Sequence, residues 1–173
     1  MEDAYTEMRH LSRSYLGNTW QMAIAGVELE GEEAVLAEVL KQHPEYWDVW
    51  EQANALPPDE EILRDGVNPF VHVMIHQMVE NQVADHDPPQ TAETLEAMVQ
   101  AGYDRHDGVH AIGALITGEI FQILKNNRPF DTADYIEALR ELAQTPRHPE
   151  KGPRSRQHRR RRSRRRRKDE HQP

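Results

Sequence analysis

The sequence contains no cysteine among its 173 residues. This absence excludes disulfide bonds, thiolate nucleophiles and every zinc or iron–sulfur site that is ligated by cysteine. Any metal that the protein binds must therefore be held by histidine and carboxylate side chains. The chain offers 10 histidines for that purpose.

Long apolar runs are also missing. The longest apolar stretch lies around residues 111–116, far short of the roughly 20 residues that a membrane-spanning helix needs. The first five residues, Met1 to Tyr5, are acidic and contain no apolar run, unlike a secretory signal peptide. We therefore expect a soluble cytoplasmic protein that does not engage a membrane.

The common motifs of enzyme active sites are absent as well. There is no phosphate-binding loop, dinucleotide fingerprint, nucleophile elbow or His-Glu-x-x-His step. The serines, at positions 12, 14, 155 and 163, stand in no hydrolase motif. These absences favour a protein without enzymatic activity, although an enzyme built on another arrangement of histidines stays open.

Charge divides the chain into two parts. Residues 1–146 hold 8 lysines and arginines against 27 aspartates and glutamates, a net charge of −19. Residues 147–173 hold 13 basic against 3 acidic residues, a net charge of +10. Such asymmetry predicts an acidic helical domain over 1–146 and a basic tail over 147–173, disordered on its own because it has almost no apolar surface to bury.

The tail carries two blocks of four arginines separated by Ser163. Arginine at this density neutralises phosphates without regard to sequence, so RNA or another polyanion is a candidate partner. The tail has no aromatic residue for base stacking. Docking of the tail on the acidic body of the same chain is the alternative. The candidate nucleic-acid-binding residues are Arg159, Arg160, Arg161, Arg162, Arg164, Arg165, Arg166 and Arg167.

Apolar residues in the acidic part recur at helical spacing, and no segment sustains a period of two. Capping residues mark three helix starts, at Asn68 before Pro69, at Asp104 and at Asp131. These patterns predict an all-α fold, a compact bundle of about five to seven helices with no sheet. Helices are expected over 4–16, 32–42, 69–83, 91–101 and 105–125 and after residue 131. A short helix that begins at Pro44 and carries Tyr46, Trp47, Val49 and Trp50 is also expected, as is a short turn of helix at 59–63. The aromatic residues Tyr46, Trp47 and Trp50 are expected in the core.

Two of the predicted helices each carry a pair of histidines four residues apart. His72 and His76 follow the Asn68 cap, and His106 and His110 follow the Asp104 cap. A spacing of four places both side chains of a pair on one helix face. If the two helices meet, four imidazoles form a site for a divalent metal such as Zn, Fe, Ni or Mn.

Glu80 continues the face of His76 by one more turn. It lies about 12 Å along the axis from His72 and so cannot share an ion with it. Glu80 is therefore predicted to ligate beside His76 or to accept a hydrogen bond from an imidazole N–H. The alternative for all these residues is a structural polar cluster, with the histidines bonded to nearby carbonyls and carboxylates.

Four blocks of sequence follow one another along the acidic part: His43-Pro44-Glu45-Tyr46, Val67 to His72 continuing through His76 to Gln82, Asp104 to Ile112, and Arg128-Pro129-Phe130-Asp131. In this order they resemble a bacterial family known as domain of unknown function 1841. The resemblance covers about residues 33–142 and implies a small, helical, cytoplasmic bacterial protein without an established activity. The basic tail lies outside the family pattern.

Three functions remain in contention. The first is a binding or interaction module with a histidine-based metal site. The second is a metal-dependent hydrolase or oxidoreductase built on the same histidines, which needs an open coordination position and a pocket. The third is an accessory protein that binds RNA or another polyanion through the arginine tail.

Overall fold

The structure, a computed structural model, describes residues 2–57 and 59–144. Within these ranges every regular element is helical, and no β-strand forms. This confirms the predicted all-α fold for the described residues, which hold seven α-helices and one 3₁₀ turn, η1 (Pro44–Tyr46). The α-helices are α1 (Glu2–Ile24), α2 (Gly31–Lys41), α3 (Trp47–Gln52), α4 (Pro69–Asp85), α5 (Pro89–Gln100), α6 (Arg105–Asn126) and α7 (Thr132–Gln144).

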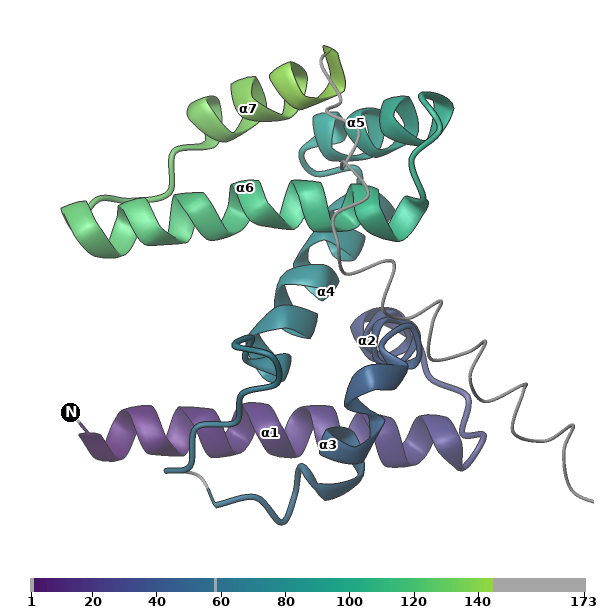
Figure 1. Cartoon of the computed structure of the whole chain (residues 1–173), viewed down its shortest axis with the longest axis vertical. Helices are drawn as coiled ribbons and strands as arrows, with labels where there is room; N and C mark the ends of the chain where they lie inside the picture. The colour runs from purple at the N-terminus through teal and green to yellow at the C-terminus, as the bar shows by residue number, and fades with distance from the viewer. Residues whose placement is uncertain (1, 58, 145–173) are drawn as a thin grey trace, which may run out of the picture.

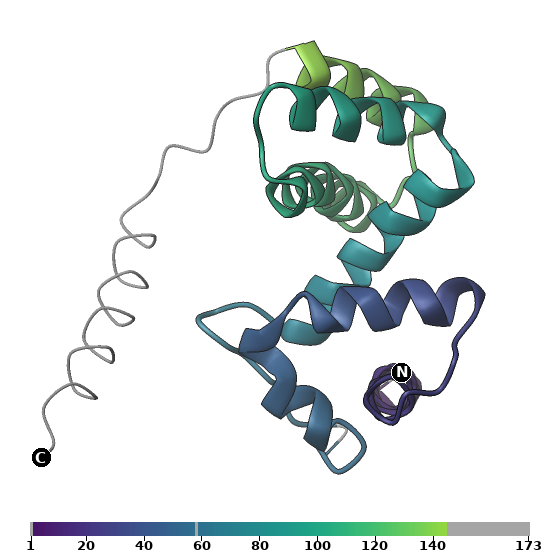
Figure 2. The same ribbon diagram turned by 90° about the vertical axis from the view of Figure 1, so that its right-hand side faces the viewer.

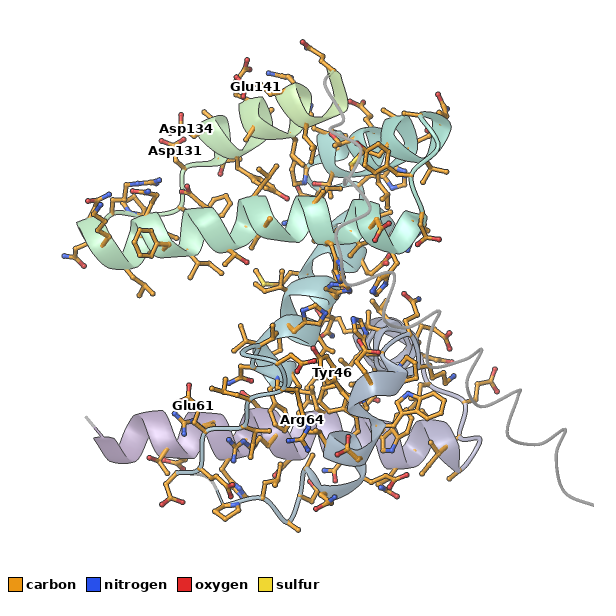
Figure 3. The ribbon with its side chains drawn as sticks, viewed as in Figure 1. Tyr46, Glu61, Arg64, Asp131, Asp134 and Glu141 are labelled. Carbon is orange, nitrogen blue, oxygen red and sulfur yellow. The ribbon has the colours of Figure 1, made fainter. Side chains whose placement is uncertain are left out.

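The predicted caps begin three of these helices. Asn68 Oδ1 accepts hydrogen bonds from the backbone N–H groups of Phe70 and Val71, at 3.0 and 3.3 Å, at the start of α4. Asp104 Oδ1 accepts from His106 N at 2.9 Å at the start of α6. Asp131 does the same for α7; its position is marked in Figure 3. Each cap satisfies backbone donors that a helix start leaves without a partner.

Helix α1 is longer than the pattern predicted, extending eight residues beyond position 16. Gly17 does not break it, because the glycine lies against the end of α3: a Cβ at this position would stand 2.9 Å from Asn54 Oδ1. Leu16 and Trp20 flank the glycine and are buried. Tertiary packing therefore extends a helix that local propensity leaves weak.

The helices form two lobes connected by α4, which crosses between them in Figure 1 and, from the side, in Figure 2. The first lobe contains α1, α2, η1 and α3. The main packing contacts of these helices are with one another and with α4. Its buried core comprises Leu16, Trp20, Leu36, Val39, Leu40, Tyr46, Val49, Trp50, Ala53, Ile62, Phe70 and Val73.

The second lobe contains α5, α6 and α7, which pack on one another, with α5 and α6 also packing on α4. Close approach of α4 and α6 depends on Gly113, where a Cβ would lie 2.9 Å from Cγ2 of Ile75. The buried core of this lobe is a separate apolar cluster of Val79, Leu95, Val109, Ile112, Ile116, Tyr135 and Leu139. The protein thus has two apolar cores that share one helix.

Two local predictions were wrong. Trp47 is 42 % exposed and packs its ring against Trp20 at a centroid distance of 5.6 Å, whereas Tyr46 and Trp50 are buried as expected. The expected helical turn at 59–63 does not form among the residues described there. That segment instead leads into a tight turn in which Arg64 and Val67 pair through their backbones.

No helix in the described part of the chain is both long and apolar enough to cross a membrane. The arginine tail over 147–173 lies outside the described residues, and its predicted disorder and its predicted contacts stay predictions.

Candidate metal centre

The two predicted histidine pairs come together, and a fifth histidine joins them. His72 and His76 project from α4 and His106 and His110 from the first turns of α6, while His43 follows the end of α2. Eight pairs among these five rings have centroids between 4.5 and 5.2 Å apart. Three chain segments, with loops between them, therefore bring five imidazoles to one point.

Four of the five form a set with the geometry of a metal site. Each offers one ring nitrogen, and the four nitrogens lie within 4.8 Å of one another. Nitrogen ligands of a tetrahedral zinc stand about 2.0–2.1 Å from the ion, and therefore about 3.4 Å from one another. A contraction of at most about 1.5 Å would bring the ligands to that spacing. The set is His43, His76, His106 and His110.

His43 is the candidate ligand that the sequence analysis did not include. Its ring is fully buried, and its Nδ1 lies 2.7 Å from the carbonyl oxygen of Val39. Because a carbonyl only accepts, Nδ1 carries the proton and Nε2 keeps a lone pair. A backbone carbonyl that fixes the tautomer in this way is a usual companion of metal-ligating histidine.

His72 lies at the edge of this set, with its Nε2 3.0 Å from Nε2 of His43. Since His43 is protonated on Nδ1, His72 must donate the proton of this hydrogen bond. In this arrangement the N–H of His72 engages the lone pair of His43 Nε2 with which His43 would bind a cation. The role of His72 as a direct ligand stays a prediction.

His76 occupies the middle of the cluster and is 3 % exposed. Its Nε2 is buried and has no hydrogen-bond partner among the residues that the structure describes. A buried polar atom left unsatisfied costs about 1–3 kcal/mol, and solvent or another side chain usually relieves that cost. Here its ring lies among four other imidazoles, with centroids 4.5–4.9 Å away.

The environment keeps His43, His72, His76 and His110 neutral, which is the form a metal needs. Burial, reinforced by His43 and the other rings, lowers the pKa of His76 to about 2 and that of His72 to about 4. Burial also lowers the pKa of His43 and that of His110, and His106 lowers both further. Near neutral pH these four imidazoles therefore carry no positive charge that would repel a cation.

Glu80 lies where the sequence placed it, one turn beyond His76, but both its oxygens are engaged by Arg105. The guanidinium donates two hydrogen bonds to the carboxylate, at 2.5 and 2.6 Å. This bidentate pair joins α4 to the residue just before His106. The fork geometry makes it one of the stronger kinds of ion pair, so it holds together the two helices that carry four of the histidines.

Tyr46, which is labelled in Figure 3, belongs to η1 of the first lobe and packs against two rings of the cluster. Its ring is stacked parallel to His43 at 6.0 Å and meets His72 edge-on at 5.8 Å. The site is therefore shielded from solvent on this side by an aromatic wall. His110, at the other side, is exposed.

A cavity of about 310 Å³ adjoins the cluster between α2, α4 and the start of α6. Gln42 connects the two, because its Oε1 lies 3.4 Å from Nδ1 of His106. The volume is at the lower end of the range for small-molecule sites. The lining residues are Ala34, Val35, Glu38, Val39, Gln42, Glu80 and Arg105.

The sequence did contain a signal for His43. Three of the blocks that carry the family resemblance contain histidine, and two of them hold the paired histidines. The third, His43-Pro44-Glu45-Tyr46, holds a single one. A histidine at the end of a helix has no neighbour at spacing four, so a search for pairs passes over it.

Of three comparisons with known proteins, the one with family models gave a match. Neither the curated proteins nor the solved structures include a significant match to the chain. A family model does match, over residues 8–141. That range contains all five histidines of the cluster and the Arg105–Glu80 pair. The chain belongs to the family described as Domain of unknown function (DUF1841).

Proposed function

We propose that this protein is a binding module that holds one divalent transition metal in its histidine cluster. The carrying observation is Nε2 of His76, which is buried without a partner among the described residues and belongs to a ring surrounded by convergent imidazoles. A structural polar cluster pairs its donors with acceptors. In this cluster Nε2 of His76 has no such partner among the described residues, and a cation would supply one.

The donor set limits the metal. His43, His76, His106 and His110 supply nitrogen only, and the nearest carboxylate considered from the sequence, Glu80, is held by Arg105. Imidazole suits zinc, copper, iron and nickel, whereas carboxylate and water suit magnesium, calcium and manganese. Zinc, iron and nickel are therefore favoured over manganese among the ions considered.

Elemental analysis of the untagged native protein tests the proposal. We expect about one equivalent of a transition metal per chain, and a rise in melting temperature when Zn²⁺, Ni²⁺ or Co²⁺ is returned to stripped protein. Mg²⁺ at the same concentration is the matched control and should leave the melting temperature unchanged. Protein that is isolated without metal and does not respond to any of the three ions would remove the proposal.

The cavity favours a second candidate, a metal-dependent hydrolase or oxidoreductase for a small substrate. Gln42 lies at once on the cavity and on His106, so a molecule in the cavity would lie near the ion. Ala34→Phe should fill the cavity from α2 without touching a histidine. If the protein is an enzyme, this variant retains the metal and loses turnover; metal-loaded wild type that turns over no ester, amide, phosphoester or redox substrate would contradict this candidate.

The tail supports a third candidate, contact with RNA or another polyanion, on its net charge of +10 alone. Retention on RNA that falls steeply with salt is the expected behaviour. Removal of residues 152–173 should abolish this retention. Unchanged retention after the deletion would exclude the tail as the contact.

A further inference from the structure

The two apolar cores meet at the histidine cluster. On α4, Val73 belongs to the core of the first lobe and Val79 to that of the second. His76 stands between them, on the buried side of the same helix. The apolar packing is thus interrupted at the seam between the lobes, and the interruption is filled by imidazoles.

The ligands of the cluster are divided between the two lobes. His43 belongs to the first lobe, His106 and His110 belong to the second, and His76 lies on the connecting helix. His43 and His106 face each other across the seam with ring centroids 4.8 Å apart. Next to them, Gln42 and His106 form a side-chain contact from lobe to lobe, and its 3.4 Å length makes it weak.

Without a cation, few polar contacts connect the two lobes directly. Of the polar atoms at the seam, His76 Nε2 is unsatisfied, and His43 Nε2 is satisfied by His72 of α4 rather than by the second lobe. An ion that ligates His43 and His106 together would draw them toward the roughly 3.4 Å spacing of a tetrahedral site. Metal binding would therefore add a bond between the lobes that side chains alone do not supply.

We propose that the bound metal couples the two lobes, so that this protein senses a divalent metal by joining two folding units that are otherwise connected mainly through α4. The inference rests on the proposed metal site. It adds what the ion does: it turns two apolar cores that share one helix into one cooperative unit. The chemical class of the ligand is a divalent cation that accepts imidazole nitrogen, such as Zn²⁺.

The chain carries its own reporters for a test. Its three tryptophans, Trp20, Trp47 and Trp50, all lie in the first lobe. Tryptophan fluorescence therefore follows unfolding of the first lobe, whereas far-ultraviolet circular dichroism follows the helices of both lobes. Coincidence of two probes is the standard sign of a single cooperative transition.

Urea unfolding of the full chain should be followed with both probes, first after chelation and then with saturating Zn²⁺. We expect two separate midpoints in the chelated protein and one common midpoint with Zn²⁺. Coincident midpoints in both conditions would overturn the inference, because the lobes would already be coupled. Separate midpoints in both conditions, with Zn²⁺ bound, would overturn it as well.

His43→Gln removes the ligand of the first lobe and leaves three ligands on α4 and α6. Calorimetry should still detect Zn²⁺ binding, weakened, while the tryptophan midpoint no longer moves with Zn²⁺. His10→Gln, an exposed histidine of α1, is the matched control and should behave as wild type. A tryptophan midpoint that still moves with Zn²⁺ in His43→Gln would contradict the coupling.

A second variant keeps the test valid if His43→Gln fails to fold. His106→Gln combined with His110→Gln removes both ligands of the second lobe. Zn²⁺ should then leave the midpoints of the two probes apart, whereas a common midpoint would contradict the inference. The outcomes also separate the two proposals: wild type that takes up no Zn²⁺ refutes the metal site itself, and wild type that binds Zn²⁺ without coupling refutes only this inference.

Discussion

The histidine cluster and the polar network around Gln82 are both partly buried and both join helices, but their polar atoms are satisfied differently. In the network, Thr91 and Tyr135 donate hydrogen bonds to Oε1 of Gln82, at 2.9 and 2.8 Å. Both hydroxyl donors of this network therefore have a partner, which is the same acceptor oxygen. In the cluster, His72 and His43 pair with each other, but Nε2 of His76 has no partner among the described residues. The network therefore needs no ligand to satisfy Gln82 Oε1, whereas in the cluster the proposed cation would satisfy the nitrogen left without a partner.

The largest expected effect is the loss of a central ligand. His76→Gln removes the nitrogen in the middle of the set, and we expect metal affinity to fall by more than the roughly 10–100-fold that loss of a supporting residue costs. Tyr135→Phe is the control from the network around Gln82. It should lose about 1 kcal/mol of stability, as for one hydrogen bond, and keep the wild-type metal affinity. Calorimetric titration with Zn²⁺ measures the metal affinity of both variants. Equal affinities would contradict the proposed difference between the cluster and the network.

The second effect is an acid sensitivity confined to the cluster. In the unfolded chain the histidines titrate near 6.5, whereas the folded pKa is about 4 for His72 and about 2 for His76. Between pH 6.5 and 4 the unfolded state binds more protons, so stability is fully present above 6.5 and falls as the pH drops. The loss across this window is on the order of a few kcal/mol, since one pKa unit corresponds to 1.36 kcal/mol for each group.

Urea unfolding of the metal-free protein between pH 7 and 4.5 measures this dependence. In His76→Gln the free energy of unfolding should depend less steeply on pH. In Tyr135→Phe it should be lower at every pH, with the same slope as in the wild type. A wild-type profile that is level over this range would show that the cluster is not buried in its neutral form.

A third, smaller effect concerns the Arg105–Glu80 pair beside the cluster. Arg105→Gln should weaken metal binding about 10-fold, because α4 and α6 lose a bidentate connection next to His106. The second lobe supplies a matched control in the Arg128–Glu119 pair, which is also bidentate, at 2.6 and 2.8 Å. Arg128→Gln should leave metal affinity unchanged. An equal loss of affinity in both variants would point to general destabilisation instead of positioning.

The smallest effect is expected at Gln42. Its contact with His106 is long, at 3.4 Å, so Gln42→Ala should lower metal affinity only about twofold, the equivalent of roughly 0.5 kcal/mol for a weak hydrogen bond. The same titration detects this change. A loss as large as that of His76→Gln would make Gln42 a ligand in its own right.

Local chemistry was the part of the fold that the sequence made predictable. Asn68, Asp104 and Asp131 act as the caps that their residue types and positions indicated, because capping depends only on neighbours within one turn. The length of α1 was not predictable, since Gly17 is tolerated only through its contact with Asn54. The partly exposed position of Trp47 likewise depends on packing between helices.

The candidate site, like the fold, was predictable in its local features and not in its long-range contacts. The spacing of four within each histidine pair is local, and it correctly placed two rings on one face of α4 and two on one face of α6. Two long-range contacts could not be read from spacing: His43 meets His72 across 29 residues, and Glu80 meets Arg105 across 25. The first added a ligand to the candidate set, and the second moved Glu80 from the histidines to a guanidinium.

X-ray absorption spectroscopy of the Zn²⁺-loaded full chain tests the central claim most directly. The account predicts one bound ion with nitrogen neighbours at about 2.0–2.1 Å and the multiple-scattering pattern of imidazole, both lost in His76→Gln. A first shell made of carboxylate and water oxygen, or a spectrum unchanged in that variant, would contradict it.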